Sequence, residues 1–329
     1  MTRRHVPWLL LAVLVLTQIC YPLTTGVTRA RLTVATVVLG YLLSVGHALL
    51  TRGPRAAVAL VAVATGGGFA IEALGVATGF PFGSYDYSGE LGPKLAGVPL
   101  IIPLAWTWMA WPAWLAAVRL TTPTGRAPGT APAGTAPAGT APAGSAAPRT
   151  AAPRTAAPRT AAPRTAAPRT AAPGSATPGW AGHAGRVALA TVGLAGWDLF
   201  LDPQMVAEGY WVWRDATPAL PGLPGIPVSN YLGWLLFAVL LMSALRPLAG
   251  SAVAVTDSRD DPMFALYLWT YFSSVLAHAV FLRLPASAVW GAVGMAVVAV
   301  PLAVTLLRAR HRPADRPAAG ARGRAVGRR

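Results

Sequence analysis

The chain has 329 residues, of which 54% are hydrophobic and only 12% are charged. With a mean hydropathy of +0.50, this composition excludes an ordinary soluble globular protein and indicates a helical membrane protein. The formal net charge is +16. The basic residues lie between and beyond the apolar segments, which argues against a nucleic-acid site and predicts contact with membrane lipid. The single cysteine, Cys20, excludes an internal disulfide and a cysteine-based metal site.

Eight apolar segments are long enough to cross a bilayer, for which about 20 helical residues are needed. They cover approximately residues 6–23, 32–50, 56–80, 98–118, 184–202, 229–246, 262–282 and 286–307. With the N-terminus inside, the inner segments hold 22 of the 27 Lys and Arg residues, as the positive-inside rule requires. We therefore predict an all-α, multi-pass protein of the cell membrane, with about eight transmembrane helices and both termini inside.

The helices are predicted to form two halves, residues 1–120 and 183–308. Residues 121–182 between them carry tandem T-A-P-A-G and P-R-T-A-A repeats. Proline at this density prevents continuous helix or sheet, and the segment lacks the apolar content of a core. We expect a disordered, basic cytoplasmic linker without chemistry, and a similar basic tail at 309–329.

The two halves repeat one pattern of acids, glycines and aromatic residues. The first copy consists of Glu72, Gly83, Tyr85, Tyr87, Gly97, Pro99 and Trp106. The second copy consists of Asp198, Gly209, Trp211, Trp213, Gly225, Pro227 and Trp234. Both acid-bearing helices run outward in the predicted topology. The duplicated acid-bearing hairpins are therefore expected to meet in one site near the outer face.

The predicted catalytic residues are the intramembrane acids, because a carboxyl group inside a membrane helix is costly and usually functional. They are Glu72, Asp198 and Asp202. A structural hydrogen bond between helices is the alternative for Glu72. Asp202 shares a helix face with Asp198, and a solvated role at the end of the helix is its alternative.

A second set of residues is predicted to bind substrate at the same level of the membrane. These residues are Tyr85, Asp86, Tyr87, Trp211, Trp213, Asn230 and His278. The alternatives are solvation or capping for Asp86, a helix N-cap for Asn230 and a structural bundle histidine for His278. Interfacial anchoring is expected for most other tryptophans, namely Trp8, Trp106, Trp108, Trp111 and Trp114.

The sequence predicts neither a metal nor another cofactor. It contains no His pair at i, i+4 and no Cys cluster, and no glycine-rich nucleotide loop follows a strand. Asp198 and Asp202 have the spacing of the aspartate motifs of magnesium-dependent membrane prenyltransferases, but a second aspartate-rich motif is missing. A membrane transporter is another alternative, because carriers also use internal repeats and intramembrane acids.

At these residues the chain resembles the membrane carotenoid-biosynthesis proteins of the CruF type, which include carotenoid 1',2'-hydratases and bisanhydrobacterioruberin hydratases. The matching stretches are EALGVATGFPFGSYDY, GVPLIIPLAWTW, GWDLFLDPQMVAEGYWVW and GIPVSNYLGW, beginning at Glu72, Gly97, Gly196 and Gly225. The resemblance implies a cofactor-free hydratase that adds water to the terminal double bond of an acyclic carotenoid. It also implies a carotenoid substrate in the membrane and association with other carotenoid-synthesis enzymes.

The residues agree with that chemistry. Hydration of an isolated alkene requires a protonated acid, a place for a tertiary cation, and a base that takes a proton from water. A buried acid beside a second carboxyl group keeps its proton more readily than an exposed acid does. Aromatic faces stabilise a nearby cation by about 0.5–2 kcal/mol each.

Overall fold

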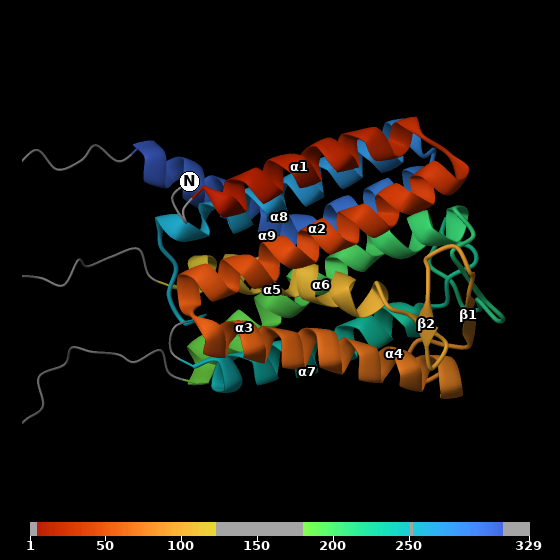
Figure 1. Cartoon of the computed structure of the whole chain (residues 1–329), viewed down its shortest axis with the longest axis horizontal. Coiled ribbons are helices and arrows are strands. Elements are labelled where there is room, and N and C mark those ends of the chain that lie inside the picture. The colour runs from red at the N-terminus through yellow and green to blue at the C-terminus, as the bar shows by residue number, and fades with distance from the viewer. Residues whose placement is uncertain (1–4, 123–179, 251–252, 312–329) are drawn as a thin grey trace, which may run out of the picture. The chain divides into compact units, whose positions relative to one another are not determined.

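The computed structural model describes residues 5–122, 180–250 and 253–311, which form a bundle of helices (Figure 1). The helices are α1 (Val6–Cys20), α2 (Gly26–Arg52), α3 (Pro54–Leu60), α4 (Gly67–Thr78), α5 (Ile102–Thr121), α6 (Trp180–Ala207), α7 (Val228–Ala249), α8 (Asp261–Leu276) and α9 (Pro285–His311). Almost all of the predicted linker and tail lies outside the described residues.

Two π-helical segments lengthen the helices next to them. Val61–Gly66 connects α3 to α4 in one rod, and Ala277–Phe281 continues α8. Counted as rods, seven helical segments in the described part of the chain are long and apolar enough to cross a membrane. The prediction of an all-α, multi-pass membrane protein is therefore confirmed.

The remaining predicted segment, 98–118, corresponds to α5, which is the most deeply buried helix of the bundle. Every residue from Ile102 to Val118 except Leu104 is buried. The helix contacts α2, α4, α6, α8 and α9. Four tryptophans and two prolines lower its average hydropathy, but a helix that is apolar on all sides belongs in the interior.

The burial of α5 corrects the expectation for its tryptophans. Trp106, Trp108, Trp111 and Trp114 are at most 4% exposed, so they fill the core of the bundle and are not interfacial anchors. Trp8 on α1 is 46% exposed, as an anchor at the membrane boundary would be.

The two copies of the repeated pattern pair with each other through short strands. β1 (Tyr85–Tyr87) and β4 (Trp211–Trp213) are antiparallel, with Tyr85 opposite Trp213 and Tyr87 opposite Trp211. Since side chains alternate along a strand, these four rings point into the protein, and Asp86 and Val212 between them are exposed. A separate hairpin joins β2 (Lys94–Leu95) to β3 (Val98–Pro99).

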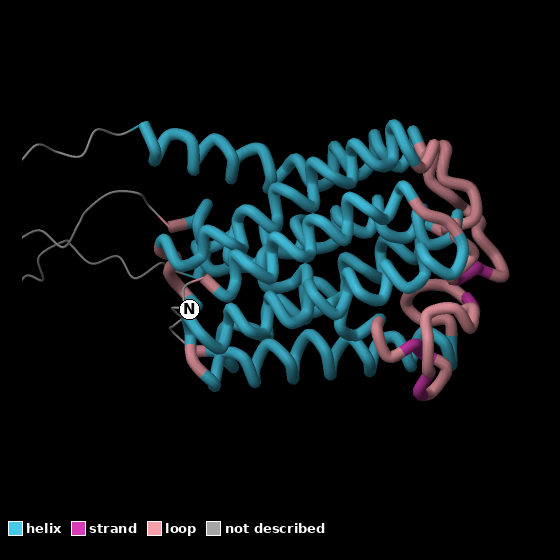
Figure 2. The backbone as a smooth tube through the Cα atoms, turned by 45° about the horizontal axis from the view of Figure 1, so that its top comes forward, coloured by secondary structure: helices cyan, strands magenta, loops and turns pink. Residues whose placement is uncertain are grey.

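The strands and the longer loops gather at one end of the bundle (Figure 2). The start of α1 and the end of α9 lie at the other end (Figure 1). Together with α5, the seven apolar segments of the described chain make an even number of helical rods, which brings both ends of the bundle to one side, as predicted. Which of the two ends is cytoplasmic remains a prediction from the positive charges.

A buried ion pair closes the end of the bundle opposite the strands. Nη2 of Arg52, at the end of α2, lies 2.7 Å and 2.6 Å from the two carboxyl oxygens of Asp260, which directly precedes α8. Both side chains are at most 4% exposed. His47 lies in the same cluster, where Nε2 is 2.9 Å from the carbonyl oxygen of Arg259. This arrangement gives His47 a structural position far from the strands.

Candidate active site

Glu72 on α4 is held by three hydrogen-bond donors. The hydroxyl groups of Tyr85 and Tyr87 donate to Oε2 at 2.7 Å and 2.8 Å, and Nε1 of Trp106 donates to Oε1 at 3.0 Å. The side chain is buried, with 5% exposure, and no salt bridge joins it to any other described residue. Three donors thus replace the water that the carboxyl group would otherwise bind.

Two glycines make room for these donors. Gly68 and Gly75 lie four residues before and three residues after Glu72, and therefore on the same face of the helix. A Cβ atom at Gly68 would lie 2.9 Å from the Trp106 ring, and one at Gly75 would lie 2.8 Å from the Tyr85 hydroxyl. The local sequence thus allows an indole and a phenol to approach Glu72 closely.

Burial, and after it the neighbouring Glu72 carboxyl group, raises the pKa of both Tyr85 and Tyr87 above the ordinary value. Both phenols therefore stay protonated at neutral pH. In that state each hydroxyl group has a proton to donate to Glu72.

The second acid group joins α6 to α7. Nδ2 of Asn230 donates to Oδ2 of Asp198 at 3.0 Å and also donates to Oδ2 of Asp202. All three side chains are at most 3% exposed. Helix α6 continues past Asp202 and Pro203 to Ala207, so the solvated alternative for Asp202 is wrong. The N-cap alternative for Asn230 is also wrong, because α7 is preceded by Pro227 at that position.

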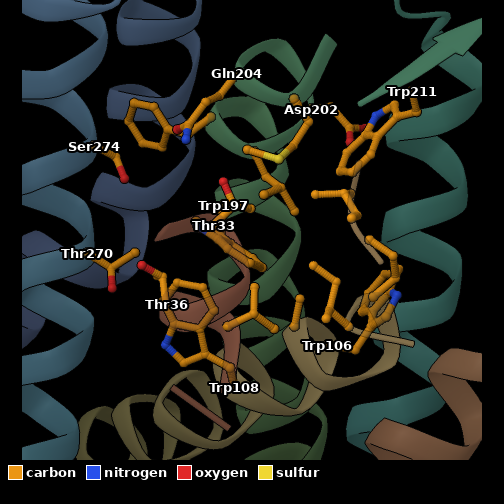
Figure 3. A pocket seen from close by; sticks show the side chains of 18 of the residues that line it. Thr33, Thr36, Trp106, Trp108, Trp197, Asp202, Gln204, Trp211, Thr270 and Ser274 are labelled. Atoms are coloured by element: carbon orange, nitrogen blue, oxygen red, sulfur yellow. The ribbon is translucent and has the colours of Figure 1, made fainter. Parts of the chain in front are cut away.

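Glu72, Asp202 and Asn230 line one cavity of about 140 Å³ inside the bundle. Figure 3 shows Asp202 on its wall near Trp211. Aromatic rings from both halves of the chain share its wall, namely Tyr85, Tyr87, Trp106, Trp211, Trp213 and Trp234. Glu72 and Asp202, one from each half, therefore face a common, largely apolar space, whereas Asp198, the counterpart of Glu72 in the repeated pattern, does not line it.

The aromatic wall is built from equivalent positions of the two copies. Trp106 and Trp234 stack with ring centroids 3.8 Å apart. Tyr85 lies 5.6 Å from Trp213, and Tyr87 lies 5.5 Å from Trp211, centroid to centroid. Such pairs stabilise each other beyond simple burial, and they fix the rings around the acids.

Three of the predicted site residues do not line the cavity. Asp198 does not line the cavity, and its Oδ2 shares the amide nitrogen of Asn230 with Oδ2 of Asp202, one turn further along the same helix. Asp86 is exposed and pairs with Arg214 across the two strands, 2.7 Å apart. The Arg214 guanidinium lowers the pKa of Asp86, so this carboxyl group is an ionised surface partner.

His278 is the third predicted site residue that does not line the cavity. It is fully buried in the π-helical extension of α8, where its two ring nitrogens lie 3.2 Å from Oε1 of Gln204 and 2.9 Å from Oγ of Ser287. Gln204 lines the cavity but His278 does not. The structural alternative for this histidine agrees with its position.

Sequence reasoning missed two features of the site. Trp106 was assigned to the interface although it is the third donor to Glu72. Its place in the repeated pattern was the signal that could have identified it. The cavity also extends away from the acids towards α1, α2 and α8.

In the described part of the chain, no three His, Cys, Asp or Glu side chains come together as a group that could hold a metal ion.

Fold and site together define a multi-pass, all-α membrane protein with an acid-bearing internal cavity. The family described as carotenoid biosynthesis protein matches residues 32–138 and 165–302. This is well over half of the chain, and the protein belongs to that family. The membrane and carotenoid-biosynthesis parts of the sequence prediction are thereby confirmed. Comparison with curated proteins gave no match, and comparison with solved structures gave none either.

Proposed function

We propose that this protein is a hydratase that adds water across the terminal double bond of an acyclic carotenoid and so forms a tertiary alcohol. The observation that carries the proposal is the single cavity in which Glu72 and Asp202, one from each half, face a wall of aromatic rings. Membership of the carotenoid biosynthesis family supplies the substrate class. The resemblance to CruF-type hydratases favours the same reaction.

The first step needs a proton donor that reaches the alkene. Asp198 and Asp202 both accept from one amide nitrogen of Asn230, and two buried carboxyl groups so close together favour a state with one shared proton. We assign the donation to Asp202, because it lines the cavity. The proton adds to the less substituted alkene carbon, the π electrons form the new C–H bond, and the tertiary carbon becomes a cation.

The aromatic wall and Glu72 then serve the second step. Ring faces stabilise the cation by about 0.5–2 kcal/mol each. A water molecule bonds to the tertiary carbon through its oxygen, and Glu72 accepts the proton that this oxygen loses. Return of that proton to the aspartate pair restores the site, and the net reaction consumes only the alkene and one water molecule.

The decisive experiment supplies purified protein in lipid nanodiscs with an acyclic carotenoid in heavy-oxygen water. We expect a product heavier by one water molecule, with the label in the new hydroxyl group, and equal activity in the presence of EDTA. A new hydroxyl group without the label, its oxygen taken from molecular oxygen, would identify an oxygenase and refute the proposal. A requirement for magnesium and a prenyl diphosphate would refute it in favour of a prenyltransferase.

Substitution of the proposed proton donor tests the mechanism separately. Asp202→Asn should lower turnover by roughly 10²–10⁴-fold, the range that general acid–base catalysis supplies. The matched control is Asp215→Asn, which makes the same change in an exposed loop residue and should leave turnover unchanged. Normal turnover of Asp202→Asn would remove Asp202 from the mechanism.

A further inference from the structure

The cavity has a second part that the proposed reaction does not use. Its wall carries hydroxyl, amide and indole groups from several helices, namely Thr33, Thr36, Trp108, Gln204, Thr270 and Ser274. In Figure 3 the side chains of Thr36, Trp108 and Thr270 lie together on the side of the cavity away from Asp202 and Trp211. We call these three residues the hydroxyl lobe.

The polar atoms of the hydroxyl lobe are buried without a partner. Oγ1 of Thr36, Oγ1 of Thr270 and Nε1 of Trp108 make no hydrogen bond to any described residue. Nearby side chains of the same kind are paired. Thr33, one turn before Thr36, donates to the carbonyl oxygen of Arg29 at 3.0 Å.

The tryptophans of α5 likewise differ in whether their N–H group has a hydrogen-bond partner. Trp106 donates to Glu72, Trp111 donates to Nδ1 of His47 at 3.0 Å, and Trp114 donates to the carbonyl oxygen of Val253 at 3.0 Å. Trp108 also lines the cavity, and among these four it alone has an N–H that is buried without an acceptor in the described residues. Buried polar groups are nearly always paired, so three unpaired groups on one stretch of wall indicate a ligand group.

The chemistry of these atoms defines what that group is. An indole N–H can only donate, whereas a threonine hydroxyl can donate or accept. The ligand must therefore bring lone pairs, as a hydroxyl or carbonyl oxygen does. Among the described residues, the charged ones that line the cavity are Glu72 and Asp202, in its other part. With no Lys or Arg on the wall, a phosphate or carboxylate does not fit, and a neutral oxygen does.

We propose that the hydroxyl lobe binds a neutral oxygen substituent of the substrate. The preferred substrate class is then an acyclic isoprenoid that already carries a hydroxyl or carbonyl group, held so that its double bond lies at the acids. This inference rests on the proposed function for the position of the double bond. The recognition of oxygen rests on the hydroxyl lobe alone.

The test measures binding, so that it is independent of turnover. Two acyclic carotenoids of equal chain length, a hydrocarbon and a monohydroxylated compound, are titrated into the full-length protein in nanodiscs. Quenching of tryptophan fluorescence gives both dissociation constants. We expect at least about tenfold tighter binding of the hydroxylated compound, because a site built to pair a hydroxyl group rejects an analogue that lacks it.

Variants then assign the preference to the lobe. Thr36→Val and Thr270→Val together, and separately Trp108→Phe, should bring the two dissociation constants to within about twofold of each other by weakening only the hydroxylated ligand. The matched control is Thr191→Val. Thr191 also has a buried, unpaired hydroxyl group, but it does not line the cavity, so this variant should keep the full preference.

Equal affinity of the wild-type protein for both ligands would overturn the inference. So would a double threonine variant that weakens both ligands alike, since the lobe would then hold only water. The two proposals can fail separately. A preference for the hydroxylated ligand without labelled product would contradict the hydratase alone, and labelled product without the preference would contradict the hydroxyl lobe alone.

Discussion

Glu72→Gln separates the catalytic role of this residue from its structural role. Gln can keep all three contacts if its oxygen accepts from Trp106 and its amide group donates to the two tyrosine hydroxyls, which can accept as well as donate. Each bond then changes from a charge-assisted one, worth about 1.5–3 kcal/mol, to a neutral one of about 0.5–1.5 kcal/mol. Because the variant no longer buries a carboxylate, part of this loss is offset. We expect a shift of only a few degrees in the melting temperature.

The effect on turnover should be much larger. An amide cannot accept the proton of the attacking water, and general base catalysis contributes about 10²–10⁴-fold. The assay is carotenoid turnover per folded protein, with folding checked by size-exclusion chromatography and thermal melting. Glu90→Gln is the matched control, because Glu90 is an exposed loop residue and should retain full activity.

Two results would contradict this reasoning. Turnover within about threefold of wild type in Glu72→Gln, far below the range of general base catalysis, would make Glu72 a purely structural group. A collapse of the melting temperature with Gln would show that the three donors require a charge. Glu72→Leu is expected to melt much lower than Glu72→Gln, since it leaves buried donors unpaired at about 1–3 kcal/mol each.

Three further predictions concern the bundle. Gly40→Ala should lower the free energy of unfolding by about 1–3 kcal/mol through overpacking, because its methyl group would lie 2.5 Å from an indole ring. The control is Gly46→Ala on the same helix, which has nothing within 4 Å and should leave stability unchanged. Equal melting temperatures of the two variants would contradict this prediction. Arg52→Leu should destabilise the protein by about 3–5 kcal/mol, because it leaves Asp260 buried without its charged partner. The double variant with Leu at both positions should melt at a higher temperature than Arg52→Leu alone. The opposite order would count against the ion pair. Replacement of residues 125–178, over part of which the family match is interrupted, by a short flexible linker should leave turnover unchanged; a large loss at equal expression would give the repeats a role.

Much of the architecture was already predictable from the order of apolar segments. In a bilayer each backbone polar group must be satisfied within its own segment, so length and hydropathy determine helices almost without regard to tertiary context. The repeated spacing of Glu72 and Tyr87 in one half, and of Asp198 and Trp213 in the other, indicated a duplicated hairpin and one shared site. These inferences depend on local sequence and period alone.

The tertiary structure decided what each side chain contacts. Hydropathy could not distinguish the tryptophans of α5 from interfacial anchors, because an indole ring suits both a membrane boundary and a core. The bridging of Asp198 and Asp202 by Asn230 depends on how α6 packs against α7, and no spacing in the sequence encodes that contact. The hydroxyl lobe likewise exists only because Thr36, Trp108 and Thr270, from three separate helices, meet at one wall. Sequence determined which groups are available in the membrane, and packing of the helices determined which of them face the cavity.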